Sequence, residues 1–533
     1  MDCTTTRLPY RQTGAFSKIA TDYIDQAAAL QPFFGQLPTK QGIKKAIEER
    51  KHFVINRKVL VEELTKQYAS VVTSEKTKNN IDLLLAGNTF TITTAHQNNI
   101  FTGPLYFIYK ILHTIKLAEQ LKASLPDNNF VPVFYIGSED ADLDELNHIW
   151  LGGEKLAWNT KQTGAVGRMK IDKQLLKLIY SIEGQVLIHP SGKEIVELLR
   201  QHYKEGTAIQ DATFSFVNAL FAEYGLIVLL PDNANLKRQA AKIFEDDLLH
   251  QAASGIVEQT AADLTKAGYK VQANPREINL FYLKGDRRDR IEKGNEVWEV
   301  VNGEEKFSEA ALLKELQEHP ERFSPNVILR GLYQETILPN IAFIGGGGET
   351  AYWLQLKKLF EHYKVPFPVL VLRNSFLLVE KKWHSLITKL GFTIEDFFLE
   401  EQELINKLVA RETDNKLKLN GTFSEAEQLY SAIKKQATAI DTTLEKHVEA
   451  LKIQTLHRLQ ELEKKMLRAE KRKFTDQQRQ IHTIKEQLFP GKGLQERREN
   501  LSYYYAKWGR EFIKKLYDNS LGFEQEFVVM IEK

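Results

Sequence analysis

The chain has 533 residues, too many for one hydrophobic core, and its hydrophobic share of 43% is ordinary for a globular protein. No apolar run approaches the roughly 20 residues of a membrane helix, and 72 basic against 70 acidic residues give no electrostatic reason to expect nucleic acid as a partner. The single cysteine, Cys3, excludes an internal disulfide and any cysteine-clustered metal site, and the chain begins without an apolar signal-type run. We therefore expect a cytoplasmic protein of two or three domains, with a free and inert thiol.

Short apolar runs alternate with amphipathic stretches through most of the chain, which predicts an α/β fold with a parallel sheet. Buried strands are expected at residues 89–94, 130–136, 226–230, 341–344 and 369–372. Between about 151 and 324, glycine-containing and charged turns interrupt this pattern. They indicate smaller subdomains inserted into a core domain that spans residues 1–399.

A polar loop follows the first predicted strand and precedes a helix. Ligands of open α/β sheets bind at the carboxyl ends of strands, so this loop is a candidate site. We assign His96 a catalytic role there, as acid, base or phosphate ligand. The alternative is that it only satisfies backbone groups of a tight turn. The substrate-binding candidates of the loop are Gln97, Asn98, Thr102, Gly103 and Tyr106.

Five carboxylates lie within seven positions directly after the second strand. Such a cluster is typical of a magnesium site or of a pair that performs acid–base catalysis. The alternative is an acidic first turn that complements a helix dipole. We assign Glu139, Asp140 and Asp142 as catalytic, and Asn147 and His148 as substrate-binding. We assign no residue as a metal ligand.

Four consecutive glycines separate the strand at 341–344 from another helix pattern. Glycines let backbone amides approach a phosphate or carboxylate closely, although this run is neither a Walker loop nor a Gly-x-Gly-x-x-Gly motif. A turn that only lets the strand meet its helix is the alternative. The nucleotide- or anion-binding candidates here are Gly345, Gly346, Gly347, Gly348, Glu349 and Tyr352.

From about residue 400 to 485 the chain is highly charged and nearly free of glycine and proline. Ser424 and Glu427 form a capping box, and apolar residues from Tyr430 to Leu451 then repeat at heptad spacing. A single helix from 424 to 480 would be roughly 80 Å long. We expect it to pack on a second copy of the chain as a homodimer, with intramolecular cover as the alternative.

A Gly-Lys-Gly loop with arginines opens the last segment, residues 486–533. Lys492 and Arg497 could hold a nucleotide or another anion. The alternative, slightly favoured, is a helix stop followed by helices that return to the core.

These segments together resemble the family of bacillithiol-biosynthesis cysteine-adding enzymes, the BshC family. The resemblance covers nearly the whole chain in the right order. The segments that carry it are His96-Gln97 with 101–106, 131–134 with 139–148, 324–340 with Gly345–Gly348 and 352–356, and 488–490 with 494–497. Two positions depart from the family's usual pattern, because Ala95 replaces glycine and Ala141 replaces histidine.

The resemblance implies a Rossmann-like core related to class I aminoacyl-tRNA synthetases, inserted connecting peptides and a coiled-coil dimer arm. It also implies the last step of bacillithiol biosynthesis, the joining of L-cysteine to the amine of glucosaminyl-malate as an amide. ATP with Mg²⁺ is a cofactor only by analogy of fold. A different nucleotide-dependent enzyme that activates an amino acid or transfers a nucleotide, or a diverged copy with weakened activity, remains the alternative.

Overall fold

The computed structural model describes residues 2–413 and 417–533, which divide into two compact units. The first unit comprises residues 1–378 and 493–533, and the second comprises residues 379–492. Each unit has its own internal packing and is described by itself.

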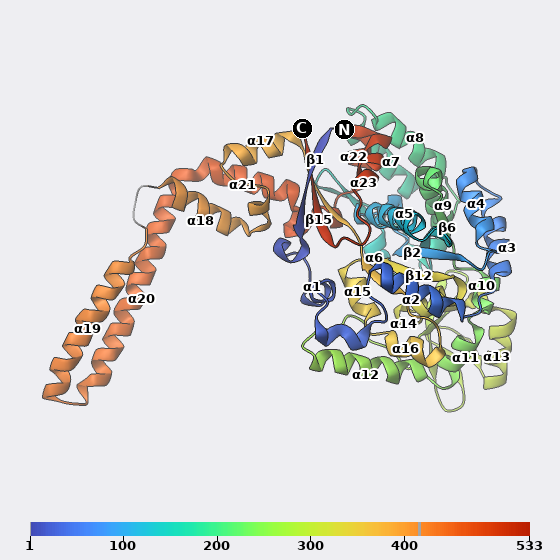
Figure 1. Ribbon diagram of the computed structural model, residues 1–533, viewed down its shortest axis with the longest axis horizontal. Coiled ribbons are helices and arrows are strands. Elements are labelled where there is room, and N and C mark those ends of the chain that lie inside the picture. The colour runs from blue at the N-terminus through green and yellow to red at the C-terminus, as the bar shows by residue number, and fades with distance from the viewer. Residues whose placement is uncertain (1, 414–416) are drawn as a thin grey trace. The chain divides into compact units, whose positions relative to one another are not determined.

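A five-stranded parallel sheet forms the centre of the first unit (Figure 1). Its strands are, in spatial order, β13 (Val369–Leu372), β12 (Asn340–Gly345), β2 (Thr89–Gln97), β3 (Asn129–Gly137) and β6 (Ile227–Leu229). All four neighbouring pairs are parallel, which confirms the predicted α/β sheet. Pro132 precedes the part of β3 that pairs with β6, so proline stands where β3 is still an edge strand.

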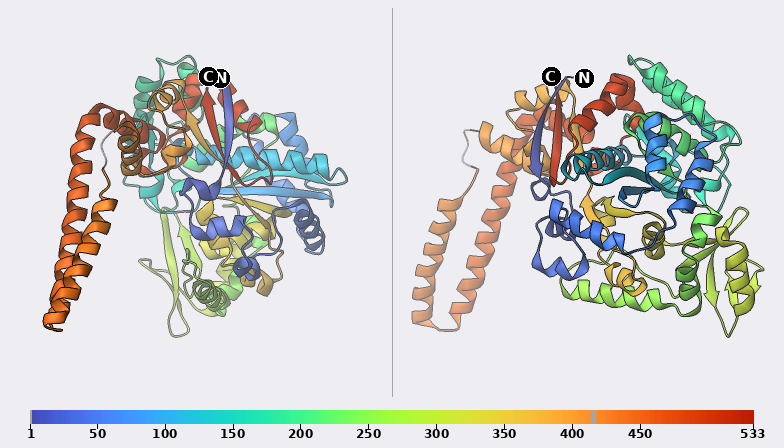
Figure 2. Two further views of the ribbon diagram at one scale, coloured as in Figure 1. Left: turned by 60° about the vertical axis from the view of Figure 1, so that its left-hand side comes forward. Right: turned by 45° about the vertical axis from the view of Figure 1, so that its right-hand side comes forward.

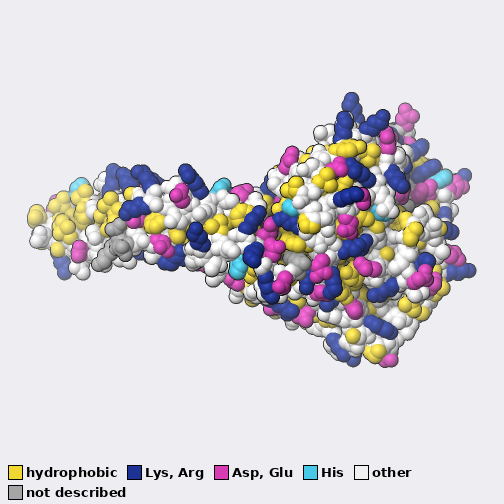
Figure 3. Space-filling model, turned by 90° about the horizontal axis from the view of Figure 1, so that it is seen from above, with side chains coloured by type: hydrophobic (Ala, Val, Ile, Leu, Met, Phe, Trp, Pro, Cys, Tyr) yellow, Lys and Arg dark blue, Asp and Glu magenta, His cyan; other side chains and the backbone are white. Residues whose placement is uncertain are grey.

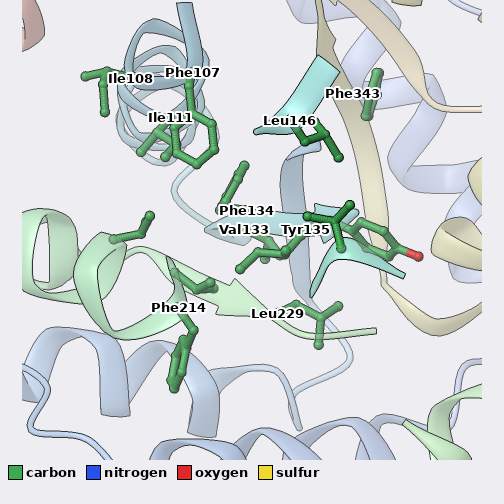
Figure 4. Close-up of a cluster of buried hydrophobic side chains, with 14 of the residues drawn as sticks. Phe107, Ile108, Ile111, Val133, Phe134, Tyr135, Leu146, Phe214, Leu229 and Phe343 are labelled. Atoms are coloured by element: carbon green, nitrogen blue, oxygen red, sulfur yellow. The ribbon is translucent and has the colours of Figure 1, made fainter. Parts of the chain in front are cut away.

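Helix α5 (Tyr106–Ser124) crosses from β2 to β3 and packs along both strands. Phe107, Ile108 and Ile111 of α5 lie over Val133 and Phe134 of β3 (Figure 4). These side chains are all fully buried. At roughly 25 cal/mol per Å² of buried apolar surface, such a contact is a main source of the domain's stability.

The other helices of the first unit surround this sheet and its insertions. They are α1 (Lys18–Ile24), α2 (Lys40–Lys51), α3 (Arg57–Tyr68), α4 (Glu75–Leu83), α6 (Leu143–Leu146), α7 (Lys173–Val186), α8 (Gly192–His202), α9 (Ile209–Phe221), α10 (Ala234–Arg238), α11 (Ala241–Leu249), α12 (Ala252–Lys266), α13 (Glu309–Glu318), α14 (Val327–Ile337), α15 (Gly347–Trp353), α16 (Lys357–Tyr363), α22 (Leu501–Trp508) and α23 (Arg510–Asp518).

Two smaller sheets lie within the segment 151–324 or at its border. A hairpin joins β4 (His148–Leu151) to β5 (Glu154–Ala157). A five-stranded antiparallel sheet has the order β10 (Lys306–Phe307), β9 (Trp298–Val300), β8 (Arg287–Lys293), β7 (Leu280–Lys284) and β11 (Phe323–Pro325). The charged turn that the sequence contains at 284–290 is the tip of the β7–β8 hairpin.

The two ends of the chain meet in one sheet. Strand β1 (Cys3–Pro9) pairs with β15 (Glu526–Glu532) in antiparallel register, and β15 lies beside β14 (Ser375–Val379) (Figure 1). Only helices were expected after residue 486, so β15 was missed. Its apolar run 527–531 is the signal that predicts a strand.

The second unit is helical. It contains α17 (Lys381–Lys389), α18 (Glu401–Glu412), α19 (Asn420–Ile440), α20 (Leu444–Lys471) and α21 (Thr475–Leu488). Helices α19 and α20 run side by side as a hairpin (Figures 1 and 2). Salt bridges from Lys434 of α19 to Glu445 and Glu449 of α20 connect them.

The expected single helix of roughly 80 Å is therefore wrong. The chain turns back at residues 441–443, and α19 finds its partner in α20 of the same chain. The predicted capping box is also wrong, because Ser424 and Glu427 lie inside α19. In α20 the buried positions are Val448 and Glu470, and neither belongs to the predicted heptad repeat, which passes through His447 instead of Val448.

Candidate active site

A cavity of about 450 Å³ lies at the carboxyl ends of the central strands. Residues at the ends of β2 and β3 line it, and so do the glycine loop after β12 and Arg373 directly after β13. The loop at His96 and the glycine run from Gly345 to Gly348 were expected to face one cavity, and both contribute to this one, although Gly345 does not line it. The lining contains four arginines and two carboxylates, namely Arg288, Arg330, Arg373, Arg497, Asp140 and Glu349.

His96 lies near the end of β2 with its ring against Tyr106 and Phe107, at centroid distances of 5.1 and 5.5 Å. Its Nε2 is buried and has no hydrogen-bond partner within the described chain. Burial, together with the positive charges of Lys110 and Arg373, lowers the pKa of His96 well below its ordinary value of 6.5. The imidazole is therefore neutral at pH 7 and can accept a hydrogen bond.

Lys110 connects the end of β2 to the start of α15. Its Nζ donates to the carbonyl of Ala95 at 2.6 Å and pairs with Glu349 Oε2 at 2.5 Å. Glu349 also accepts the N–H of Gly346 at 2.8 Å, which is the one half of a capping box that a glycine N-cap allows at the start of α15. The carboxylate thus takes up one backbone N–H of this helix start, that of Gly346. We conclude that Glu349 shapes the glycine loop.

Asp140 lines the cavity as an ionised carboxylate. Both of its oxygens accept hydrogen bonds from the guanidinium of Arg330 on α14. Burial opposes ionisation, but the charge and hydrogen bonds of Arg330 outweigh it, so the pKa of Asp140 is lowered. An acid with a lowered pKa holds no proton at pH 7, and Asp140 cannot act as a general acid there.

Arg373 and Arg497 lie on the Tyr106 side of the cavity. The guanidinium of Arg373 is 5.0 Å from the ring centre of Tyr106, and it pairs with buried Glu496 at 2.7 Å. Burial raises the pKa of Tyr106 to about 12, so its hydroxyl stays protonated. Arg497 is exposed and lines the same cavity.

The remaining members of the acidic cluster do not converge on this cavity. Glu139 is buried against Lys237, which also pairs with Asp232 at 3.3 Å. Burial raises the pKa of Glu139 despite this cation. Asp142 is exposed at the start of α6. In the described ranges no group of three His, Cys, Asp or Glu side chains could hold a metal ion.

Other predicted residues lie outside the cavity lining. Asn98 is buried and donates to Thr213 at 3.1 Å. Thr102 and Gly103 form a left-handed turn whose glycine carbonyl accepts from Asn500 at 2.6 Å. The other predicted site residues that do not line the cavity are Asn147, His148, Gly345 and Lys492. Lys492 belongs to the second unit. Gln97, Tyr106, Tyr352, Glu349 and Gly346–Gly348 do line it.

Several lining residues were not assigned to the site from sequence. Arg373 follows the buried strand β13 directly, so the rule that found His96 also applies to it. Asn326 caps α14 and precedes Arg330 by one helical turn. Arg288 and Phe281 come from the inserted antiparallel sheet, and no sequence signal connects that hairpin to the central sheet.

The two departures from the family pattern lie in different surroundings. Ala95 lines the cavity, and its carbonyl accepts from Lys110. Ala141 is exposed to solvent and does not line the cavity. An imidazole at position 141 would therefore lie on the surface of this fold.

Comparison with known proteins gives matches over nearly the whole chain. The N-terminal Rossmann-like domain of bacillithiol biosynthesis BshC matches residues 1–374, and the C-terminal coiled-coil domain of BshC matches residues 376–532. A "Putative cysteine ligase BshC" from Flavobacterium psychrophilum is 40% identical and covers 96% of this chain and 96% of its own. The protein with the same description from Flavobacterium johnsoniae is 37% identical, over 98% and 99% of the two chains.

A solved structure described as an arginyl-tRNA synthetase from Campylobacter jejuni covers 88% of this chain and 100% of its own. Its identity of 10% and TM-score of 0.23 are too low to support an argument. In the described part of the chain, no helix is long and apolar enough to cross a membrane.

Proposed function

The chain belongs to the BshC family of bacillithiol biosynthesis, whose members are described as cysteine ligases, and we propose that it joins the carboxyl group of L-cysteine to the free amine of glucosaminyl-malate. The product is an amide, and the pathway step is the last one.

The cationic cavity is the observation that carries this proposal. Its four arginines outnumber its two carboxylates, and both of those carboxylates have internal cationic partners. A cavity of this charge suits anionic small molecules. L-Cysteine brings one carboxylate, and the malate part of the acceptor brings two.

Activation of the cysteine carboxylate is required because a carboxylate is a poor electrophile toward an amine. ATP with Mg²⁺ would supply the phosphoryl or adenylyl group with which one carboxylate oxygen departs. Arg373, Arg497 and the loop Gly346–Gly348 are the residues that would hold its phosphates. A Cβ at Gly346 would lie 3.4 Å from Glu349 Oε2 and 3.5 Å from Arg373 Nε, so the glycine loop passes directly beside that guanidinium.

His96 is the residue that we propose to receive the amine. An amine attacks a carbonyl only in its neutral form, and the proton that it loses as the amide forms passes to water or to the departing phosphate. The neutral ring of His96 can accept a hydrogen bond from that amine and orient it, with Tyr106 packed beside the ring. We expect His96→Ala to reduce turnover by about a hundredfold, because the amine loses the hydrogen bond that orients it toward the carbonyl.

Mass-spectrometric profiling of low-molecular-weight thiols in a deletion strain tests the proposed reaction. Loss of bacillithiol together with accumulation of glucosaminyl-malate supports it, and the intact gene should restore the thiol while a His96→Ala copy should not. An unchanged thiol pool in the deletion strain contradicts the proposal.

We also propose that the protein is a homodimer that forms through the helical hairpin. Exposed apolar side chains remain on α19 and α20 after the two helices have packed together, and Figure 3 shows hydrophobic side chains gathered at the tip of the hairpin. Those with more than half of their surface exposed are Leu429, Ile440 and Ile453.

A further inference from the structure

Arg288 brings the inserted antiparallel sheet to the cavity. It lies on β8, and its guanidinium stacks 3.8 Å from the ring centre of Phe281 on the neighbouring strand β7. Its Nε donates to Ser324 Oγ at 3.1 Å. Both Arg288 and Phe281 line the cavity. The aromatic ring and the hydroxyl hold the guanidinium in a fixed plane.

Arg288 has no ion-pair partner among the described residues, whereas two other arginines that line the cavity do. Arg330 is paired with Asp140 through two hydrogen bonds, and Arg373 is paired with Glu496. The Nη2 of Arg288 is buried and has no hydrogen-bond partner in the part of the chain that the structure describes. Burial lowers the pKa of Arg288 to about 10, and the charge of Asp140 offsets part of that effect. A half-buried guanidinium with an unused buried donor favours an anionic ligand.

The cavity has two cationic regions with different surroundings. Arg373 and Arg497 both act on Tyr106 and lie with the glycine loop. Arg288 and Arg330 both act on Asp140, next to the inserted sheet. The proposed reaction brings two anionic molecules together, and the phosphates of a nucleotide fit the region with the glycine loop. The other region, with a planar guanidinium held on an aromatic ring, fits a carboxylate.

We propose that Arg288 is the specificity-determining residue for the acceptor substrate and binds a malate carboxylate. This inference rests on the proposed function and goes beyond it, because it assigns acceptor recognition to the inserted sheet. Nη2 of Arg288 donates hydrogen bonds to the carboxylate, and Arg330 keeps its two hydrogen bonds to Asp140.

Steady-state kinetics of Arg288→Met test the assignment, because methionine keeps an unbranched side chain on Phe281 and removes the charge. We expect the KM for glucosaminyl-malate to rise about 10- to 100-fold, the scale of a lost charge-assisted hydrogen bond. We expect kcat and the KM values for cysteine and ATP to change less than about threefold. Arg288→Lys should recover part of the affinity, since it restores the charge without the planar fork.

Two comparisons separate recognition from general damage. The methyl glycoside of glucosamine carries the same amine without malate, so the variant and the unmodified enzyme should use it equally well. Arg290→Met is the matched control, because Arg290 lies on the same strand, pairs with Glu292 at 3.2 Å and does not line the cavity. It should leave all constants unchanged.

An unchanged KM for glucosaminyl-malate in Arg288→Met overturns the assignment. So does a raised KM for cysteine or ATP, because Arg288 would then bind a different anion. If the unmodified enzyme forms no amide, the proposed function fails first, and calorimetric titration with glucosaminyl-malate decides about Arg288 alone. Binding that is about tenfold weaker in the variant supports the assignment, and equal or absent binding contradicts it.

Discussion

Lys110 is buried, yet it holds together two loops whose positions in the sequence are far apart. It contacts Ala95 near the end of β2 and Glu349 in α15, while burial lowers its own pKa. The ion pair with Glu349 offsets part of the free energy that is lost by burying the ammonium group of Lys110. Each loop contributes lining residues to the cavity, so the geometry of the site depends on one ammonium group.

Replacing Lys110 with methionine should therefore damage both stability and activity. The change leaves the Glu349 carboxylate without its cation, which should lower the free energy of unfolding by about 3 kcal/mol, the lower end for a broken buried pair. Turnover should fall about a hundredfold, because both loops lose their anchor. Urea denaturation and steady-state rates measure the two effects.

The double change Lys110→Met with Glu349→Gln should recover part of the lost stability. Lys122→Met, at the exposed end of the same helix, should cost less than about 1 kcal/mol. A loss as large in Lys122→Met as in Lys110→Met would show that the ion pair is not the cause.

His113 makes the stability of the first unit dependent on pH. Its Nδ1 accepts the N–H of Asn374 at 3.1 Å, so Nε2 carries the proton and donates to the carbonyl of Gly522 at 2.7 Å. Burial lowers the pKa of His113 to about 4. The unfolded chain binds a proton near pH 6.5 that the folded chain does not bind, so stability is full above about pH 6.5.

As the pH falls from about 6.5 to about 4, this histidine alone should remove about 3 kcal/mol from the free energy of unfolding. Unfolding by urea at a series of pH values measures the slope. In the His113→Gln protein, the free energy of unfolding should change less steeply with pH between about 4 and 6.5, by the contribution of one bound proton. Parallel curves for the two proteins would contradict the assignment of the neutral tautomer.

At the scale of single residues, the sequence identified the parts of the site that follow a general rule. Polar residues directly after a parallel strand reach the ligand edge, and His96, Gln97 and Asp140 follow it. Charge clustering was a weaker guide, because Glu139 and Asp142 point to a buried lysine and to solvent. Arg288 was not predictable, since its place depends on how an inserted hairpin packs.

At the scale of elements, the hairpin α19–α20 shows what a heptad pattern leaves open. The apolar repeat continues across residues 441–443 without glycine or proline, so it indicates one helix. The break is stabilised locally, because Asp441 Oδ1 accepts the backbone N–H and the hydroxyl of Thr443, both at 2.8 Å. A heptad seam requires a partner helix but does not state which chain supplies it.

Val448 provides a test of the hairpin, because it is a buried apolar side chain of α20 with only 5% of its surface exposed. Val448→Asp places an unpaired charge at that position, and backbone amides of α19 and α20 should then exchange with solvent about tenfold faster or more. Hydrogen exchange read by mass spectrometry should show no change in the central strands of the first unit. Lys446→Ala, at an exposed position on the same helix, serves as the control. Unchanged exchange in α19 would show that the two helices open independently.

At the scale of the whole molecule, the alternating pattern of apolar runs predicted the parallel sheet and the presence of insertions. It did not predict that the two ends of the chain pair with each other in one sheet. Thr4 of β1 lies opposite Ile531 of β15, a contact between residues more than five hundred positions apart. Short-range periodicity contains no information about pairing at that distance, and each strand also lies outside the run of alternating strands and helices.

Self-association is a property of the whole molecule, and the hairpin determines which apolar surface is left for it. The two helices cover part of their apolar surface on each other, so a dimer must use what is left exposed. Ile440 retains 84% of its surface and Leu444 retains 37%, on either side of the turn. Light scattering at micromolar concentration should give twice the chain mass of 61.3 kDa.

Ile440→Lys together with Leu444→Lys should shift that mass toward the monomer, because two added charges per chain would face each other across an apolar contact. Both residues lie beside the turn and neither is buried in the hairpin, so the far-ultraviolet circular dichroism should stay unchanged. Glu425→Lys with Glu427→Lys is the control, since it adds more positive charge at exposed positions away from the turn. A monomeric mass for the unmodified protein at high concentration would contradict the dimer, and equal dissociation by both pairs of substitutions would place the contact elsewhere on the hairpin.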